Sequence, residues 1–203
     1  MAGKLLVLEG LSAVGKSTVA SSLAQRLSAD LVMTVPQEFE ELRHMVCCHD
    51  SLDARYTFFF AAMVSSSRVI KERLSSGRNV VCESFIYRTI AFHRGMGSRL
   101  NYTIPVDFPV ADFAFHLTCA QEIRHRRLAT RDKIFTVWDQ CAEDSTEAIL
   151  DEYAVFNMIE VDTTNMPVRE LVEALAQRVE LDEIRQPVAR HQNLFSAVPG
   201  APT

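Results

Sequence analysis

Several features that would place the chain in another class of protein are absent. No apolar run approaches the ~18 residues that a membrane helix needs, and the first residues lack the basic region and apolar segment of a secretory signal. The net charge of −5 gives no support to a surface that binds nucleic acid. We therefore expect a cytoplasmic protein that binds neither membranes nor nucleic acid.

Cysteines are few and do not form the pattern of a disulfide framework. The chain has five, an odd number, and no Cys-x-x-Cys pair. They are Cys47, Cys48, Cys82, Cys119 and Cys141. His44 and His49 flank the first pair, but neighbouring side chains point in different directions and no second ligand cluster follows. Structural zinc usually has four well-spaced ligands, so we do not expect a zinc site.

The most informative segment that is present joins an apolar strand to a glycine-rich loop. Leu5 to Leu8 lead into Gly-x-x-x-x-Gly-Lys-Ser at residues 10–17, which is the phosphate-binding loop of P-loop NTPases. Its glycines allow backbone angles that a side chain forbids, so successive N–H groups can point at phosphate oxygens. A helix from about Ser17 adds its positive dipole end. We expect the nucleotide phosphates on Gly10, Ser12, Ala13, Val14, Gly15, Lys16, Ser17 and Thr18.

Short apolar runs alternate with helical patterns along the chain, which predicts an α/β fold with a parallel sheet. The predicted strands are about 4–9, 30–35, 79–82, 112–117 and 157–161. The helical patterns after the first helix cover about 54–74, 85–95, 119–131 and 143–154, and a last helix opens at Met166-Pro167. We expect a five-stranded parallel sheet flanked by helices on both faces, one domain over residues 1–185, and a weakly ordered tail over 186–203.

Further features favour a small-molecule kinase among P-loop proteins. The guanine-reading motif Asn/Thr-Lys-x-Asp is absent, and the chain is too short for a transport or motor ATPase. The strand 79–82 ends at Glu83, a carboxylate that can hold the hydration shell of Mg²⁺ beside the loop. Arginines from Arg124 to Arg131 follow the strand 112–117, where small kinases carry a lid. We expect this lid at about 124–133.

At these residues the chain resembles the thymidylate kinase and deoxynucleoside kinase superfamily, in the same order from Lys4 to about Val179. Its matching segments are residues 8–18, Phe60-Ala61-Ala62, Glu83-Ser84-Phe85, Ala111-Asp112-Phe113, the arginine-rich lid and Val161-Asp162-Thr163-Thr164. The resemblance implies a P-loop kinase fold, ATP as phosphate donor and Mg²⁺ as cofactor. It also implies that Thr163 and Thr164 line the adenine.

The chain departs from both subfamilies in residues that hold the acceptor. Thymidylate kinases have Asp at the position of Ser12, Asp-Arg-Tyr or Asp-Arg-His where this chain has Glu83-Ser84-Phe85, and Arg at the position of Val64. Each missing arginine removes charge-assisted bonds worth about 1.5–3 kcal/mol. A monophosphate acceptor is then less expected unless other arginines replace them. The candidates are Arg43, Arg55 and Arg88.

Deoxynucleoside kinases offer a different match. They have Glu-Arg-Ser at the end of the third strand and a glutamate general base after the second strand, where this chain has Glu38. A hydroxyl acceptor needs a carboxylate to take its proton, whereas a phosphate acceptor needs arginines. Neither subfamily fits completely.

We therefore predict an ATP-dependent phosphotransferase that acts on a nucleoside or nucleoside-like molecule. A nucleoside monophosphate kinase of the thymidylate type is the alternative, and a nucleotide-binding regulatory protein is the alternative of another class. The expected catalytic residues are Lys16, Glu38, Glu83, Arg127 and Arg131, with Arg127 and Arg131 on one helix face. Ser17 and Glu83 would hold Mg²⁺. The expected acceptor-binding residues are Glu38, Arg55, Tyr56, Phe59 and Arg88, and the protein could form a homodimer.

Overall fold

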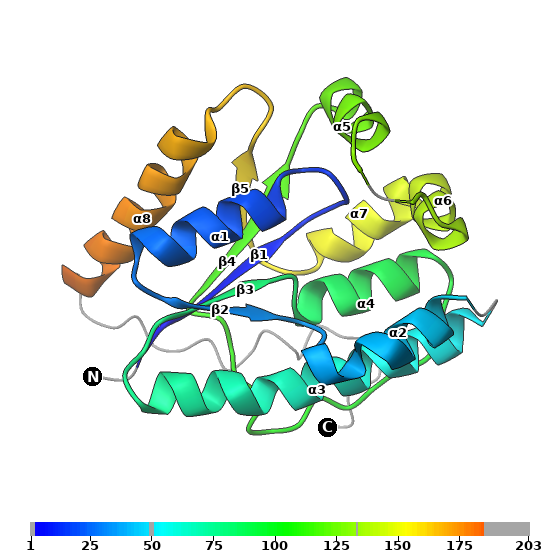
Figure 1. Cartoon of the computed structure of the whole chain (residues 1–203), viewed down its shortest axis with the longest axis horizontal. Helices are drawn as coiled ribbons and strands as arrows, with labels where there is room; N and C mark the ends of the chain where they lie inside the picture. The colour runs from blue at the N-terminus through cyan, green and yellow to red at the C-terminus, as the bar shows by residue number, and fades with distance from the viewer. Residues whose placement is uncertain (1–2, 49–50, 133, 185–203) are drawn as a thin grey trace.

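A computed structural model describes residues 3–48, 51–132 and 134–184 (Figure 1). The segment 186–203, for which the composition predicted a weakly ordered tail, lies outside these residues. Across the described chain, no helix is both long and apolar enough to cross a membrane.

Five parallel strands form one sheet in the order β2-β3-β1-β4-β5. They are β1 (Leu5–Glu9), β2 (Asp30–Met33), β3 (Val80–Glu83), β4 (Phe113–Thr118) and β5 (Ile159–Asp162). The central strand β1 is buried along its whole length, as its unbroken run of Leu and Val requires in a sheet that is covered on both faces. The predicted sheet and fold class are confirmed.

Helices cover both faces of the sheet (Figure 1). One face carries α1 (Lys16–Arg26) and α8 (Val168–Ile184), and the other carries α3 (Leu52–Ser75), α4 (Ile86–Gly95) and α7 (Thr146–Ala154). The remaining helices are the 3-10 turn η1 (Gln37–Phe39), α2 (Glu40–Cys47), α5 (Gln121–Ala129) and α6 (Val137–Asp144).

Two helix predictions are wrong in their bounds. The segment predicted as one helix over 143–154 contains α7 and only the end of a separate helix, α6. The start of α6 is fixed at Thr136, whose hydroxyl accepts from the Asp139 N–H while the Asp139 carboxylate accepts from the Thr136 N–H; such a capping box begins a helix. The helix predicted over 119–131 ends at Ala129, so Arg127 and Arg131 do not share a helix face.

The fold places the candidate site at one edge of the sheet. Because all five strands are parallel, their carboxyl ends meet at that edge, where α/β proteins bind their ligands. The loops that follow β1, β2 and β3 are neighbours there, because β1 and β2 both pair with β3.

Candidate active site

The loop after β1 has the backbone of a phosphate-binding loop. Gly10 has φ +132°, and a Cβ on it would lie 2.3 Å from the Leu117 carbonyl oxygen, so no other residue fits. Gly15 has φ +105° and stands directly before α1. The glycines at both ends of the motif are therefore required by the backbone, and the helix begins where the dipole can act on an anion.

Lys16 is the first residue of α1 and is nearly buried, with 8% of its surface exposed. Its Nζ donates to the Leu11 carbonyl oxygen at 2.7 Å, so the ammonium is folded back over the loop. Burial, and next the positive charge of Arg88, lower the Lys16 pKa from 10.5 to about 7. An anion bound in the loop would reverse this effect, since it favours the charged form.

Ser17 and Glu83 meet across the sheet edge, as expected for a shared metal. The Ser17 hydroxyl donates to Glu83 Oε1 at 2.6 Å. A hydroxyl and a carboxylate are hard oxygen ligands that Mg²⁺ accepts together with water and phosphate oxygens. Among the described residues, no group of three or more His, Cys, Asp or Glu could hold a metal alone. The two oxygen donors of Ser17 and Glu83 fit a hard cation such as Mg²⁺.

The loop after β5 packs against the phosphate-binding loop and is hydrogen-bonded to it. Thr163 is buried, and its hydroxyl lies 2.8 Å from the Val14 carbonyl and 2.9 Å from the Thr118 carbonyl. The Thr164 hydroxyl donates to Asp162. The hydroxyls of both threonines are thus engaged within the protein, and their contact with the adenine stays a prediction.

The arginine cluster divides into three different roles. Arg124 is only 3% exposed and makes two hydrogen bonds of 2.6 Å to Glu143, so it fastens α5 to α6. Arg127 donates to the hydroxyl and carbonyl of Thr163, at 3.3 and 3.0 Å, and thus holds the loop after β5. Arg131 is exposed, lines a hollow of about 480 Å³, and lies near enough to Lys16 to lower its pKa. Of the three, Arg131 is the one whose side chain has no protein partner among the described contacts.

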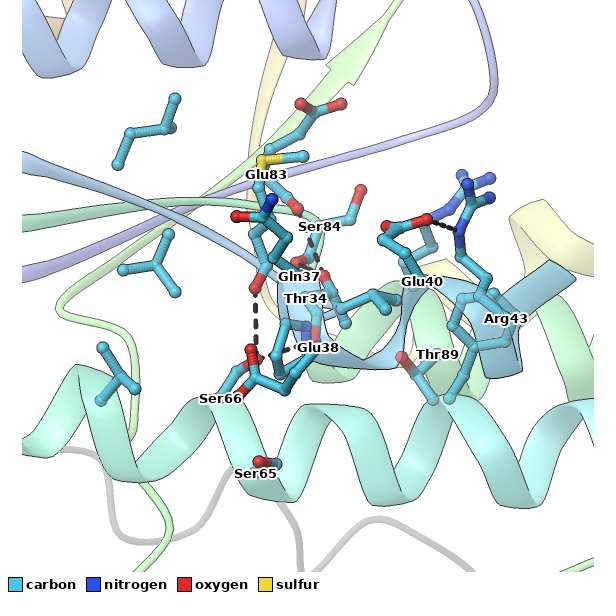
Figure 2. Close-up of a pocket in the computed structure, with 18 of the residues that line it drawn as sticks. Thr34, Gln37, Glu38, Glu40, Arg43, Ser65, Ser66, Glu83, Ser84 and Thr89 are labelled. Atoms are coloured by element: carbon cyan, nitrogen blue, oxygen red, sulfur yellow. Dashed lines mark hydrogen bonds and ion pairs between the residues drawn. The ribbon is translucent and has the colours of Figure 1, made fainter.

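A second, larger cavity of about 770 Å³ opens beside the phosphate-binding loop (Figure 2). Its wall is formed by the end of β2, the segment through η1 and α2, one face of α3 and the start of α4. The predicted residues in this wall are Glu38, Arg43, Phe59, Glu83, Ser84 and Arg88. Glu83 therefore lies both at the candidate Mg²⁺ site, beside Ser17, and in the wall of this cavity.

Arg88 connects the cavity to the phosphate-binding loop. Its Nη1 donates to the Gly10 carbonyl at 2.9 Å, and its Cζ lies 3.5 Å from the centre of the Phe92 ring. Such a cation–π contact holds a guanidinium plane in place. Arg43 lies in the α2 part of the wall and pairs with Glu40 at 2.6 Å.

Two residues expected to bind the acceptor are not in the cavity wall. Tyr56 is 1% exposed and stacks on His93 with ring centres 4.7 Å apart, so its predicted contact with a sugar or base is wrong for this conformation. Arg55 lies between the rings of Phe59 and Trp138, at 4.7 and 5.3 Å. Its Nη1 donates to Cys47 Sγ at 3.1 Å, and Phe59 is the wall residue on which its guanidinium lies.

The sequence reasoning missed several polar residues of the wall. They include Thr34, Gln37, Ser66 and Thr89, four of those labelled in Figure 2. A helical signal was available for Ser66, since Phe59, Ser66 and Val69 are spaced by seven and three residues and lie on one face of α3. The other three come from separate elements, and no local pattern joins them.

Comparison with known proteins gives a consistent result. A family model described as thymidylate kinase matches residues 8–175. Thymidylate kinase of Rhizorhabdus wittichii is 30% identical over 206 residues, which cover 87% of this chain and 98% of that protein. Thymidylate kinase of Neorickettsia sennetsu is 33% identical over 111 residues, which cover 50% of this chain and 55% of that one.

A solved structure of thymidylate kinase from Candida albicans is similar in fold, with a TM-score of 0.71 over 90% of this chain and 93% of that chain, at 19% identity. The predicted superfamily and the prediction of an ATP-dependent phosphotransferase are confirmed. The match supports the alternative acceptor class, a nucleotide, over the nucleoside that we placed first. The chain belongs to the thymidylate kinase family of ATP-dependent nucleotide kinases.

Proposed function

We propose that the chain transfers the γ-phosphoryl group of ATP to a nucleoside monophosphate of the thymidylate type, with Mg²⁺ as cofactor. One observation carries this proposal beyond the family match. Arg43 and Arg88 line the same cavity as Ser84, the position at which thymidylate kinases have a phosphate-binding arginine. Arg43 and Arg88 would thus supply the positive charge that Ser84 lacks.

On the donor side, the loop amides and Lys16 would bind the phosphates of ATP. Lys16 would exchange its bond to the Leu11 carbonyl for phosphate oxygens, and the negative charge there would keep the ammonium protonated. Ser17 and Glu83 would hold Mg²⁺, which when bound neutralises phosphate charge and orients the transferred group. Arg131, which is exposed two residues after the end of α5, is the proposed cation over that group.

On the acceptor side, arginines matter more than a general base. A phosphate acceptor has no hydroxyl proton to lose, and catalysis of phosphoryl transfer is mainly positioning and charge stabilisation. Arg88 is already oriented by Gly10 and Phe92, so it loses little freedom when it binds. Glu38 lines the cavity, and it would act as general base only if the acceptor were a nucleoside.

Four further predictions from the sequence remain part of this proposal. They are a single domain over residues 1–185, a cytoplasmic location, a possible homodimer, and the absence of a nucleic-acid partner.

The proposal is tested with Arg43→Met, which removes a cation of the cavity wall that lies on α2. Loss of one charge-assisted contact of about 1.5–3 kcal/mol predicts a rise in the KM for thymidylate of roughly 10- to 100-fold, with the KM for ATP unchanged. The matched control is Arg99→Met, because Arg99 is exposed and outside the cavity wall. An unchanged KM for thymidylate would remove Arg43 from the acceptor site.

A further inference from the structure

Glu9 is a buried carboxyl group that the proposed chemistry does not use. It is the last residue of β1, directly before the phosphate-binding loop, and none of its surface is exposed. Oε1 accepts a hydrogen bond from the Phe85 N–H at 2.7 Å, whereas Oε2 is buried and has no partner among the described residues. Burying a carboxyl group with one bare oxygen is costly. Packing alone therefore does not account for a carboxyl group at this position.

The bond from Glu9 fixes an unusual turn. Ser84 has φ +60°, a left-handed conformation that strains any residue except glycine. Its N–H donates to the Leu8 carbonyl at 2.9 Å, and its own carbonyl accepts from the Thr34 hydroxyl. The following N–H, that of Phe85, is held by Glu9. Hydrogen bonds to Leu8, Thr34 and Glu9 thus hold the strained turn at Ser84 and Phe85 in place.

This turn determines where two site residues point. Glu83 directly precedes it and accepts from Ser17, and α4 begins directly after it with Arg88 in its first turn. A tilt of the Ser84–Phe85 peptide would move both side chains together. A shift of about 1 Å in such groups can lower a rate by roughly 100-fold.

Charged and titratable groups face Glu9 from four elements, and burial outweighs the cations among them, so the Glu9 pKa is raised. Lys16 of α1 and Arg88 of α4 favour its ionised form, while burial opposes it. Cys82 of β3, Tyr87 of α4 and Tyr153 of α7 also face it, and each has its own pKa raised, first by burial and then by the Glu9 charge. An ionised carboxylate has no donor, so either oxygen can hold the Phe85 N–H.

We infer that Glu9 is a positioning residue for phosphoryl transfer: its hydrogen bond to the Phe85 amide sets the turn that aims Glu83 at Ser17 and Arg88 into the acceptor cavity. The inference rests on the proposed function for the roles of Glu83 and Arg88. The role that we infer depends on whether the Glu9 side chain is long enough to accept the Phe85 N–H, and not on how it packs.

Three variants separate reach, charge and packing. Glu9→Gln keeps an oxygen at the same reach without the charge, Glu9→Asp keeps the charge but is one methylene shorter, and Glu9→Met keeps only the volume. We expect kcat/KM for thymidylate to stay within about tenfold in Glu9→Gln and to fall roughly 30- to 100-fold in the other two. The melting temperature of Glu9→Met at pH 8 should equal or exceed that of the wild type, because no buried charge remains.

Other rankings of the three variants by activity contradict the inference. Higher activity in Glu9→Asp than in Glu9→Gln would mean that the charge of Glu9, not its reach, supports phosphoryl transfer. Equal activity in all three variants would mean that Glu9 does not position the site. Parallel loss of activity and stability in Glu9→Met would make the residue structural, and if that variant does not fold, the Gln and Asp pair alone decides.

Calorimetric titration of each variant with ATP and Mg²⁺ adds a readout that needs no acceptor. If the wild type turns over no monophosphate, the proposed function fails. The inference on Glu9 then stands or falls on whether Glu9→Asp binds more weakly than Glu9→Gln.

Discussion

Ionisation of Glu9 should make the stability of this protein depend on pH in a calculable way. Burial raises the Glu9 pKa from 4.5 to about 7, although the Phe85 N–H, Arg88 and Lys16 all lower it. Between these two values the folded chain keeps a proton that the unfolded chain has lost. The stability contributed by this group is therefore highest at low pH and falls as pH rises toward 7.

The magnitude follows from the two pKa values. At ~1.4 kcal/mol for each pH unit, the ionised carboxylate costs on the order of 3 kcal/mol more in the folded than in the unfolded chain. Glu9→Gln does not titrate at this position, so between pH 5 and pH 8 its free energy of unfolding should rise by about 2.5 kcal/mol relative to that of the wild type. The constant cost of burying the amide cancels in this comparison.

Urea denaturation followed by circular dichroism at pH 5, 6, 7 and 8 measures the difference. Glu122→Gln, an exposed site on α5, is the matched control and should follow the wild type at every pH. A difference between wild type and Glu9→Gln that stays constant across the four pH values would refute the reasoning.

Three further predictions concern single residues. Lys16→Ala should lower phosphoryl transfer by roughly 100-fold or more without lowering the melting temperature, because the buried ammonium does not favour folding; a variant with normal turnover would contradict the site. Glu143→Ala leaves Arg124, 3% exposed, without its partner and should cost about 3 kcal/mol in urea denaturation, whereas a loss below about 1 kcal/mol would mean that the pair does not hold α5 to α6. Ser84→Gly should stabilise the fold by about 1 kcal/mol, and destabilisation would show that φ +60° carries no strain.

The phosphate-binding loop could be predicted from the sequence because its information is local. Gly10, Gly15 and Lys16 fall within seven residues, and the backbone geometry they require follows from the absence of side chains at the two glycines. The sheet could be predicted for a similar reason, since each strand is a short apolar run between helical patterns.

The arginines could not be assigned from the sequence because their partners are distant. Arg124 pairs with Glu143, nineteen positions away, and Arg127 with Thr163, thirty-six away. A run of arginines on a helix does not reveal which of them faces a buried partner. The helix end at Ala129 separated Arg131 from the others, and no glycine or proline marked it.

The sequence favoured a nucleoside acceptor over a nucleotide for a related reason. Ser84 in place of arginine made a phosphate acceptor less expected, because the sequence offers Arg43, Arg55 and Arg88 as replacements without showing which of them reach the same space. The cavity wall brings Arg43 and Arg88 to the same space from two other elements. Tyr56 illustrates the reverse case: the sequence placed it among the acceptor-binding residues, but its side chain is 1% exposed and stacks on His93 inside the protein.

The central claim is most directly tested by ADP formation from ATP in a coupled assay with thymidylate and, separately, with thymidine at the same concentration. The account predicts turnover with thymidylate that exceeds turnover with thymidine by roughly 100-fold or more, with no ADP formed in the absence of an acceptor. Turnover with thymidine alone would move the protein to hydroxyl phosphorylation and to Glu38. ATP binding without turnover on either acceptor would contradict the account.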